Sequence, residues 1–521
     1  MHKPNGANST GDDVLCDCRF VNRREFLKRS ALTSAWLLAG TTGISSLTGC
    51  GDSFEWKAVS FPKVLFYNFG LFDGIKNQLQ QNRILLIDGD KIQAIERQED
   101  LAGYKNYKRV DLQGRTVLPG LIDNHVHITV PFMYSVNFNT VQQMNPQILY
   151  NFRNCVFGGV TTVRDVGGFP GKINKYRALA DRNEIPGPRV ISSLSPIAAR
   201  KGDELGAPEK APYFTNPVIK WIIGGNYAER PTTLKEIETA CEEMIQLGAQ
   251  WLKTLQQDHP YSYSSRKLPN HPDEGYRAII EIGKKNGIKS ALHQPLLSGF
   301  EKGVDRGFDT LEHTPMDAVI SDEYVEKFMR QDMAIMPTIM IYGDSLVTDK
   351  ILQLIKTHGD RYLMPEALKQ MSARLLKSIT VDRNKLSETE YNDLQFDNQY
   401  AIDMFPNVIA NIKKLHRMGA TIGAGSDIGG TASGFFGRFT DELKHYANAG
   451  FSNFEILQMA TAINARIIDL QDKIGVIAKG KLADIIVVDG NPLTDIAALD
   501  NIRLVMKGGV FVKTEDLEMG V

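Results

Sequence analysis

The chain has 521 residues, of which 42% are apolar and 23% are charged, and its formal net charge is -1 at pH 7. This length is enough to bury a large core and exceeds the size of one average domain. The near-neutral charge, without a long basic stretch in the body of the chain, excludes a nucleic-acid footprint, so we expect no nucleic-acid partner.

The first fifty residues are typical of an export signal. Arg23 and Arg24 begin the run Arg-Arg-Glu-Phe-Leu-Lys, and an uncharged stretch extends from residue 30 to residue 49. A basic segment before a modest apolar segment indicates a signal peptide, and this stretch is too weakly apolar to predict a transmembrane helix. The arginine pair resembles the twin-arginine signal of bacteria.

A second signature follows the first in the expected order. The run Leu47-Thr48-Gly49-Cys50 resembles a lipobox, in which the cysteine is acylated and becomes the mature N-terminus. We therefore predict that residues 1–50 are an export signal, that Cys50 is lipidated and that residues 51–61 form a tether. The mature chain would be a lipoprotein, exported from the cytoplasm and anchored to a membrane on its periplasmic or extracellular side. The alternative is a chance arginine pair before an apolar segment.

Cysteine usage agrees with this interpretation. Cys16 and Cys18 would leave with the signal, whereas Cys155 and Cys241 lie in segments with a helical pattern. We expect the latter two to be buried small apolar residues rather than a disulfide.

The two ends of the mature chain share the pattern of short β-strands. Residues 62–115 contain apolar runs separated by turns such as Asp88-Gly89-Asp90, and residues 475–515 contain similar runs, including Ile485-Ile486-Val487-Val488. Turn residues between short apolar runs predict strands. We expect one small β-sandwich assembled from both ends.

Residues 116–474 alternate between strand and helix patterns. The strand candidates, each followed by a helical pattern or a loop, are 117–128, 160–166, 188–195, 249–256, 288–294, 310–314, 334–340 and 420–427. Eight such units predict an α/β fold with a TIM-like (β/α)8 barrel. The segment 343–400 is longer than a connecting loop requires and has a helical pattern. It is either an excursion over the mouth of the barrel or a surface helical hairpin.

Six side chains with metal-binding chemistry lie near the C-terminal ends of these strand candidates. They are His125, His127, Lys253, His293, His313 and Asp427. In a barrel these strand ends form the active-site face, and side chains two apart on a strand point the same way. One histidine on an apolar strand is more often a core residue than a ligand. Burying four imidazoles and a carboxylate together without a cation, however, would carry a heavy desolvation penalty. We predict a site for two divalent metal ions.

Lys253 needs a separate explanation, because a charged ammonium would repel bound metal ions. Burial beside cations lowers the pKa of a lysine and favours the neutral amine. A neutral amine can add carbon dioxide, and the resulting carbamate has two oxygens that can bridge two ions. The alternative is a lysine paired with a nearby carboxylate.

Four motifs complete the pattern. They are Pro119-Gly120-Leu121-Ile122-Asp123-Asn124-His125-Val126-His127, Gly159-Val160-Thr161-Thr162-Val163-Arg164-Asp165, Leu311-Glu312-His313 and Gly480-Lys481-Leu482-Ala483-Asp484. With them, the chain resembles the amidohydrolase superfamily over about residues 62–515. The resemblance is to the branch that includes imidazolonepropionase-like and Xaa-Pro dipeptidase-like enzymes. These motifs are specific for the superfamily and much less specific for a substrate.

The resemblance implies a binuclear metal centre, most often of zinc, although manganese, cobalt or iron would also suit such ligands. The more buried ion would be held by His125, His127 and Asp427. His293 and His313 would hold the second ion, and carboxylated Lys253 would bridge the two, with a hydroxide between them. Asp427 would be the catalytic residue, taking the proton of the attacking hydroxide and passing it to the leaving nitrogen.

The resemblance also implies the reaction. We expect hydrolysis of a C–N bond in a small-molecule linear or cyclic amide, such as a dipeptide, an N-acyl amino acid or a cyclic amide. A mononuclear-metal deaminase of the same superfamily is the nearest alternative, but its glutamate after the third histidine is absent from His293-Gln294-Pro295-Leu296. A non-catalytic exported binding protein is the other alternative, although all six ligands are present. A homo-oligomer remains compatible with the sequence.

Three loops bear on the substrate. The loop from Ala198 to Gly202 lacks the Gly-Gly-His-Gly type of segment common in dipeptidase-like relatives, which weakens a direct transfer of Xaa-Pro dipeptidase activity. Substrate-binding candidates in the loop after Lys253 are Tyr261, Tyr263 and Arg266, which could hold a substrate carboxylate or simply lie on the surface. The glycine-rich segment 429–434 could lie against the substrate or serve as a turn.

Overall fold

The computed structural model describes residues 56–130, 138–200, 225–260, 267–343, 348–380, 385, 398–429 and 434–515. By chain contacts, Met1–Glu55 is one unit and Trp56–Val521 is another, and all described residues belong to the second. The predicted export signal, including Cys50, therefore lies outside the described residues. Among the described residues, no helix combines the length and the apolar character needed to cross a bilayer.

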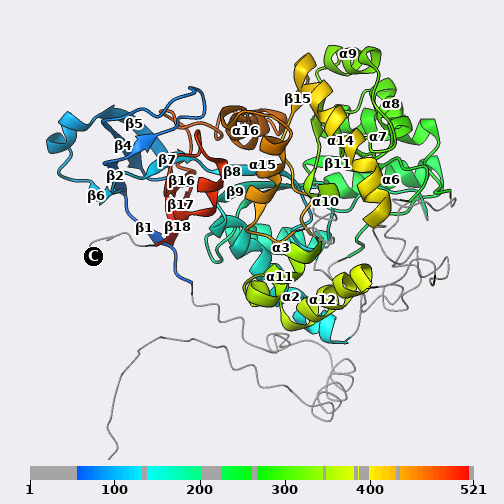
Figure 1. The fold of residues 1–521 in the computed structure, drawn as a ribbon, viewed down its shortest axis with the longest axis horizontal. Coiled ribbons are helices and arrows are strands. Elements are labelled where there is room, and N and C mark those ends of the chain that lie inside the picture. The colour runs from blue at the N-terminus through cyan, green and yellow to red at the C-terminus, as the bar shows by residue number, and fades with distance from the viewer. Residues whose placement is uncertain are drawn as a thin grey trace, which may run out of the picture. The chain divides into compact units, whose positions relative to one another are not determined.

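Strands from both ends of the second unit form two sheets that lie side by side (Figure 1). The six-stranded sheet has the order β1-β18-β17-β16-β7-β3, and the four-stranded sheet has the order β5-β4-β2-β6. The strands of the first are β1 (Val59–Ser60), β18 (Val510–Thr514), β17 (Ile502–Lys507), β16 (Ile485–Val488), β7 (Thr116–Pro119) and β3 (Gly70–Leu71). Those of the second are β5 (Lys91–Arg97), β4 (Arg83–Asp88), β2 (Lys63–Tyr67) and β6 (Lys108–Asp111). One apolar cluster joins the two sheets, with Val64 and Phe66 from β2 packed with Val487 and Leu504.

Eight further strands are parallel and occur in the chain order that the sequence predicts. They are β8 (Leu121–Val126), β9 (Val160–Asp165), β10 (Arg189–Ser192), β11 (Trp251–Leu255), β12 (Lys289–His293), β13 (Thr310–Glu312), β14 (Ala334–Met336) and β15 (Thr421–Ile422). Strands β8 to β10 form one sheet and β11 to β15 another. Single parallel bridges join their edges, Ile197 to Thr254 on one side and Val126 to Ile428 on the other. The fold is therefore α/β, and the arrangement is consistent with a TIM-like barrel.

Helices connect the parallel strands in the predicted alternation (Figure 1). They are α2 (Phe138–Phe157), α3 (Pro170–Asp181), α6 (Leu234–Gln246), α7 (Asp273–Lys285), α8 (Leu297–Arg306), α9 (Asp322–Arg330), α14 (Asn398–Met418) and α15 (Phe439–Asn448). Helix α6 shows how local sequence fixes a start, because Thr233 and Glu236 form a reciprocal capping box. Cys155 in α2 and Cys241 in α6 are free and buried, which confirms the prediction made for both.

The single strand predicted over 117–128 is wrong in one respect, because the chain changes sheets within it. Strand β7 pairs with β16 of the six-stranded sheet, whereas β8 pairs with β9 of the parallel set. Gly120 lies between them, and a Cβ at this position would come within 2.2 Å of the Thr161 hydroxyl oxygen. Only glycine therefore permits this close crossing between the two sheets.

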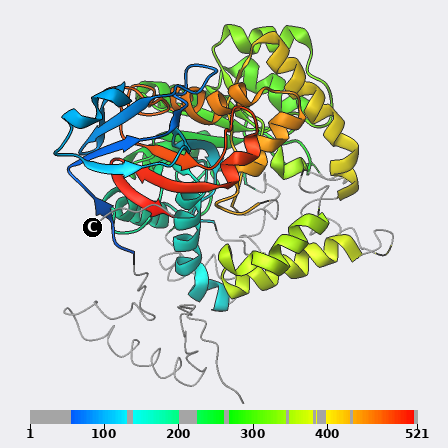
Figure 2. The same cartoon turned by 60° about the vertical axis from the view of Figure 1, so that its left-hand side comes forward.

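The segment predicted over 343–400 is helical where it is described. Helices α11 (Thr348–His358) and α12 (Pro365–Thr380) form a pair that lies beside α2, as Figure 2 shows in yellow-green and cyan. The buried amide of Gln147 in α2 donates to the carbonyl of Tyr362 at 3.0 Å and accepts from the Met364 amide at 2.7 Å. The described part of this segment is thus a helical hairpin anchored on α2.

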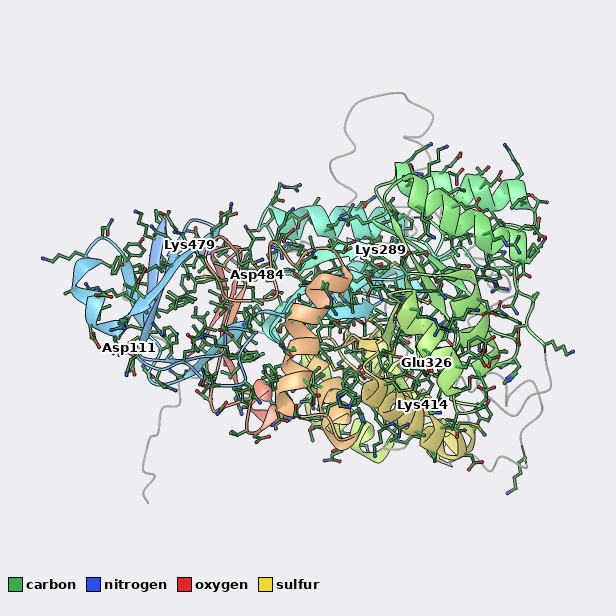
Figure 3. The ribbon with its side chains drawn as sticks, turned by 90° about the horizontal axis from the view of Figure 1, so that it is seen from above. Asp111, Lys289, Glu326, Lys414, Lys479 and Asp484 are labelled. Carbon is green, nitrogen blue, oxygen red and sulfur yellow. The ribbon has the colours of Figure 1, made fainter. Side chains whose placement is uncertain are left out.

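Asp484, from the motif at 480–484, links the six-stranded sheet to the parallel strands (Figure 3). Its carboxylate pairs with Arg189 at 2.6 Å and accepts the Gly508 amide at 2.8 Å. Because Arg189 begins β10, this ion pair fixes the C-terminal strands against the parallel set. The motif therefore has a structural role at the N-terminal end of β10.

One buried side chain, Asn464, reinforces the junction between the first and last parallel strands, where the Asn124 amide also donates to the Ala424 carbonyl at 3.0 Å. The Asn464 amide nitrogen donates to the carbonyls of Ile122 and Ala424, both at 2.7 Å, and its oxygen accepts the Ala424 amide at 3.1 Å. Asn464 follows a π-helical turn, Met459–Ile463, a kind of irregularity that is common near functional sites. The side chain thus adds to the backbone hydrogen bonds that join the two segments at this junction.

We expect Asn464→Leu to lower the free energy of unfolding by at least ~2 kcal/mol, because it leaves buried backbone groups without partners. Thermal and urea unfolding would measure the loss. Asn286→Ala is the matched control, since it removes a single exposed hydrogen bond to Ile282. Equal stability of Asn464→Leu and the wild type would contradict the role given to this residue.

Candidate metal centre

An irregularity in β8 sets the direction of the first two histidines. Ile122 packs in the cluster that holds Trp251 and Ala291, the residues two positions before Lys253 and His293 on their strands. The pairing of β8 with β9 shifts between Asp123 and Val126. In a regular strand, residues three positions apart, such as Ile122 and His125, face opposite sides. The shift in pairing lets His125 face the same side as Ile122, Lys253 and His293. Bulges of this kind re-aim side chains next to active sites.

His125 and His127 converge on Asp427. The Nε2 atoms of the two imidazoles lie 3.3 and 3.1 Å from the Oδ1 atom of Asp427. Asp123 holds the segments that carry them, because its carboxylate accepts the hydroxyl of Ser426 at 2.5 Å and the backbone amides of Ser426 and His125 at 3.0 and 3.2 Å. His125, His127 and Asp427 are the three side chains that the sequence predicts as ligands of the more buried ion.

His293 and His313 form an adjoining pair. The Nδ1 atom of His293 lies 2.7 Å from the Nε2 atom of His313. The ligand atoms of His125, His313 and Asp427 lie within 4.8 Å of one another, close enough to surround a metal ion. The structure therefore brings the four predicted imidazoles and the carboxylate into one cluster.

The ring nitrogen that faces away from this cluster has an oxygen partner in all four histidines. These pairs are His125 Nδ1 with Glu312 at 2.6 Å, His127 Nδ1 with the Gly167 carbonyl at 2.7 Å, His293 Nε2 with the Gln257 side chain at 3.1 Å, and His313 Nδ1 with the Thr338 hydroxyl at 2.7 Å. Carboxylate and carbonyl oxygens only accept, so the histidine nitrogen must donate. The Thr338 hydroxyl itself donates to the Pro337 carbonyl at 2.7 Å, which leaves it to accept from His313. The nitrogens left to bind a metal are Nε2 of His125, His127 and His313 and Nδ1 of His293.

Lys253 is buried at 4% exposure, and its amine has no hydrogen-bond partner in the described part of the chain. Burial lowers its pKa to about 8, although the negative charge of Glu312 opposes this effect. The ion pair considered as an alternative from the sequence does not form among the described residues. An amine that is poorly solvated and readily neutral meets the chemical requirement for carbamate formation.

The charge states of the other side chains suit metal binding. Burial, the neighbouring His313 and Lys253 hold the pKa of His293 well below its usual range, and burial does the same to His313. Burial would raise the pKa of Asp427, but His125 and the other imidazoles outweigh it and hold this pKa well below its usual range. By contrast, although burial lowers it, hydrogen bonding to Asp427 leaves the pKa of His127 raised. The nitrogen and carboxylate donors present are those that a borderline-soft divalent ion prefers, so the residues fit the predicted cofactor.

A buried ion pair beneath the cluster has no assigned role in the sequence prediction. One guanidinium nitrogen of Arg164 lies 2.7 and 2.8 Å from the two carboxylate oxygens of Glu312. Arg164 also donates to the Asn124 carbonyl at 2.6 Å and packs over the ring of Trp251 at 4.5 Å. Both charged residues belong to the motifs that carry the resemblance. Their charge within apolar strand runs is the signal that could have identified them.

Other predicted site residues lie outside the described residues. These are Tyr261, Tyr263 and Arg266, together with residues 201, 202 and 430–433 of the two loops named above. Gln257 and Thr338, which contact His293 and His313, were not predicted. Their polar side chains resemble many others in loops, and the sequence offers no signal that distinguishes them.

Comparison with known protein families identifies the class. Residues 116–512 match the profile of the Amidohydrolase family. The match spans more than half of the chain and includes all six predicted ligands, so the protein belongs to the amidohydrolase family. It is a hydrolase that acts on carbon–nitrogen bonds. A comparison with curated proteins gives no significant match.

Solved structures share the fold at low sequence identity. A Xaa-Pro dipeptidase with bound methionine is 22% identical, with a TM-score of 0.65, covering 86% of this chain and 99% of its own. A prolidase complexed with N-methylphosphonate-L-proline is 21% identical, with a TM-score of 0.66 and coverage of 87% and 100%. An ochratoxinase from A. niger is 19% identical, with a TM-score of 0.64 and coverage of 88% and 97%. At these identities the likeness is one of fold.

Proposed function

We propose that this protein hydrolyses the C–N bond of a linear or cyclic small-molecule amide, using two divalent metal ions, most often zinc. The observation that carries the proposal is the cluster of four imidazoles and the Asp427 carboxylate together with the buried amine of Lys253, which has no hydrogen-bond partner among the described residues. The parallel strands form the (β/α)8 barrel that presents these side chains, and the strands from both chain ends form the accompanying β-sandwich.

The family resemblance divides the side chains between two ions. The first would be held by Nε2 of His125, Nε2 of His127 and the Asp427 carboxylate, and the second by Nδ1 of His293 and Nε2 of His313. The neutral amine of Lys253 attacks carbon dioxide, a nitrogen–carbon bond forms, and the amine proton leaves to solvent. The two carbamate oxygens would supply ligands for the two ions.

The side chains of this protein move the proton in the reaction. When bound, two such ions acidify a water molecule and polarise a carbonyl. Asp427 is ionised at neutral pH because its pKa is held low, so it can accept the proton of the attacking water. It then returns the proton to the nitrogen of the scissile bond, which leaves as an amine.

One position disfavours the deaminase alternative. Where a deaminase carries a glutamate three residues after the third histidine, this chain has Leu296, which is buried. A hydrocarbon side chain cannot act as an acid or base. The names of two structural neighbours, a Xaa-Pro dipeptidase and a prolidase, support dipeptides as the first substrates to test.

The experiment is a screen of dipeptides, N-acyl amino acids and cyclic amides with the zinc-loaded full-length protein. Absence of turnover on all three classes would refute the proposal.

The N-terminal sequence supports a location. We propose that the twin-arginine and lipobox patterns of residues 1–50 direct export and lipidation of Cys50, which anchors the enzyme to a membrane. A twin-arginine route carries folded proteins and suits an enzyme that acquires metal before export. Mass spectrometry of the mature N-terminus tests this directly, and an unmodified Cys50 within an intact signal would contradict it.

We expect Asp427→Asn to lower kcat by about 10²–10⁴-fold, because the proton carrier is lost while the side chain keeps its shape. Bound metal, measured by elemental analysis, should change little. Asp469→Asn, which removes an exposed carboxylate paired with Lys289, is the control and should retain full activity. A fully active Asp427→Asn enzyme would contradict the proton-transfer role.

Replacing Lys253 with alanine should reduce the metal content below two ions per chain, because the bridging carbamate is lost. Short-chain carboxylic acids should partly restore metal and turnover by occupying the space of the carbamate. The control is Lys289→Ala, a lysine on the neighbouring strand whose amine pairs with Asp469. If Lys253→Ala retains both ions and normal rates, the carbamate does not exist.

A further inference from the structure

An aromatic side chain stands beside one of the proposed metal ligands. The ring centroid of Tyr227 lies 6.3 Å from that of His127, with an angle of 56° between the ring planes. The ring centroid of Phe169 lies 6.1 Å from that of Tyr227, with an angle of 55°. Separations and tilts of this size are those of interacting aromatic pairs. The three rings therefore form a series that starts at His127, and the proton transfer assigned to Asp427 uses neither Tyr227 nor Phe169.

The segment that carries Tyr227 is held against the loop that follows β10. The Ser195 hydroxyl donates to the Asn226 carbonyl at 2.5 Å. Two backbone hydrogen bonds of 2.9 Å join Glu229 to the same loop, one in each direction. This loop follows the C-terminal end of a parallel strand, where a TIM-like barrel places its active site. The fold therefore fixes the backbone on both sides of Tyr227 at the active-site face.

Phe169 and Tyr227 differ in their exposure. Phe169 is buried, at 6% exposure, and lies at the N-cap of α3, where its amide donates to the Thr129 hydroxyl at 3.2 Å. Tyr227 is half-buried. Phe169 therefore supports the Tyr227 ring from the protein interior, and Tyr227 presents part of its own surface to a bound molecule.

The exposure of the imidazoles around Asp427 shows on which side this carboxylate can be approached. The Asp427 carboxylate lies within 4 Å of three of them, those of His125, His127 and His313. The side chains of His125 and His313 are 1% and 2% exposed, whereas that of His127 is 14% exposed. A substrate group that reaches Asp427 therefore lies on the side of His127, where Tyr227 stands.

The nitrogen of the scissile bond must come within hydrogen-bond reach of Asp427 to receive its proton. The substituent on this nitrogen then extends past His127 to the Tyr227 ring. We propose that Tyr227, supported by Phe169, is a specificity-determining residue that selects an aromatic group on the leaving-nitrogen side of the scissile amide. This inference rests on the proposed function, because Asp427 places the leaving nitrogen, and it adds the substrate class.

An aromatic group gains more at this position than an aliphatic group of the same size. Both bury apolar surface against the Tyr227 ring. An aromatic ring also forms a tilted or offset pair with the tyrosine, a contact worth about two- to tenfold in affinity beyond the area buried. A substrate with a ring on its leaving amine therefore gains from both effects, and a substrate with a methyl group there gains little from either.

The test compares kcat/KM for matched dipeptides with the zinc-loaded full-length protein. Alanyl-phenylalanine carries the ring on the leaving side, phenylalanyl-alanine carries the same ring on the acyl side, and alanyl-alanine is the common reference. We expect the wild type to prefer alanyl-phenylalanine to alanyl-alanine by about tenfold. Alanyl-cyclohexylalanine, which has the bulk without the aromatic character, should fall between these two.

Tyr227→Ala should bring the preference for alanyl-phenylalanine to within about twofold of unity, because both ring contact and burial are lost. The ratio of phenylalanyl-alanine to alanyl-alanine should not change. Tyr227→Phe keeps the ring and should keep the preference. Each ratio is measured on one preparation, so it does not depend on the fraction of protein that is folded or loaded with metal. Tyr104→Ala is the matched control, since it removes a half-buried tyrosine paired with Tyr107 outside the parallel strands, and it should keep both ratios.

The outcomes separate the inference from the function on which it rests. A wild type that hydrolyses none of the three amide classes would refute the proposed function. A wild type that hydrolyses amides without preferring alanyl-phenylalanine, or a preference that survives in Tyr227→Ala, would leave that function intact and overturn the role of Tyr227. A loss in Tyr227→Ala that follows the acyl-side ring would overturn it as well. Equal rates for alanyl-cyclohexylalanine and alanyl-phenylalanine would overturn the choice of an aromatic substrate.

Discussion

The candidate centre depends on how the first and last parallel strands meet. His125 and Asp427 come from segments 302 positions apart in the sequence numbering, and only a few residues hold them together. The Asp123 carboxylate connects the two segments through Ser426. Asn464 donates hydrogen bonds to a carbonyl in each segment, that of Ile122 and that of Ala424. Because the ligands of one metal position come from both sides of this junction, its geometry decides whether that position exists. The remaining strands bring His293, His313 and Lys253 to the same level.

The order of elements and the clustering of the candidate ligands could be predicted from the sequence for a physical reason. Parallel strands place their carboxyl ends at one edge, so a chemically unusual residue at the end of each strand pattern predicts a common site. The alternation of strands and helices in the centre of the chain is equally visible, because each element has its own apolar period. Residues such as His293 and Lys253 can therefore be identified from the local sequence of their own strands.

Features that depend on contacts between distant segments could not be predicted in this way. The division of 117–128 into two strands depends on the closeness of Gly120 to Thr161, and nothing in either local sequence shows it. The partners of the histidines are similar: Thr338 and Gln257 are ordinary loop residues until the fold brings them to an imidazole. Arg164 and Glu312 were visible as charges within apolar strands, but their pairing required the three-dimensional structure.

Two of the proposed metal ligands have an unusual backbone. His313 and Asp427 adopt φ values of 75° and 54°, in the left-handed region that costs most residues other than glycine about 1–3 kcal/mol when the surroundings enforce it. Glycine at either position would relieve this strain and remove a ligand at the same time. The most thermostable form of this scaffold would thus be one that has lost its chemistry, and a search for stabilising substitutions that ignores activity would select against the centre first.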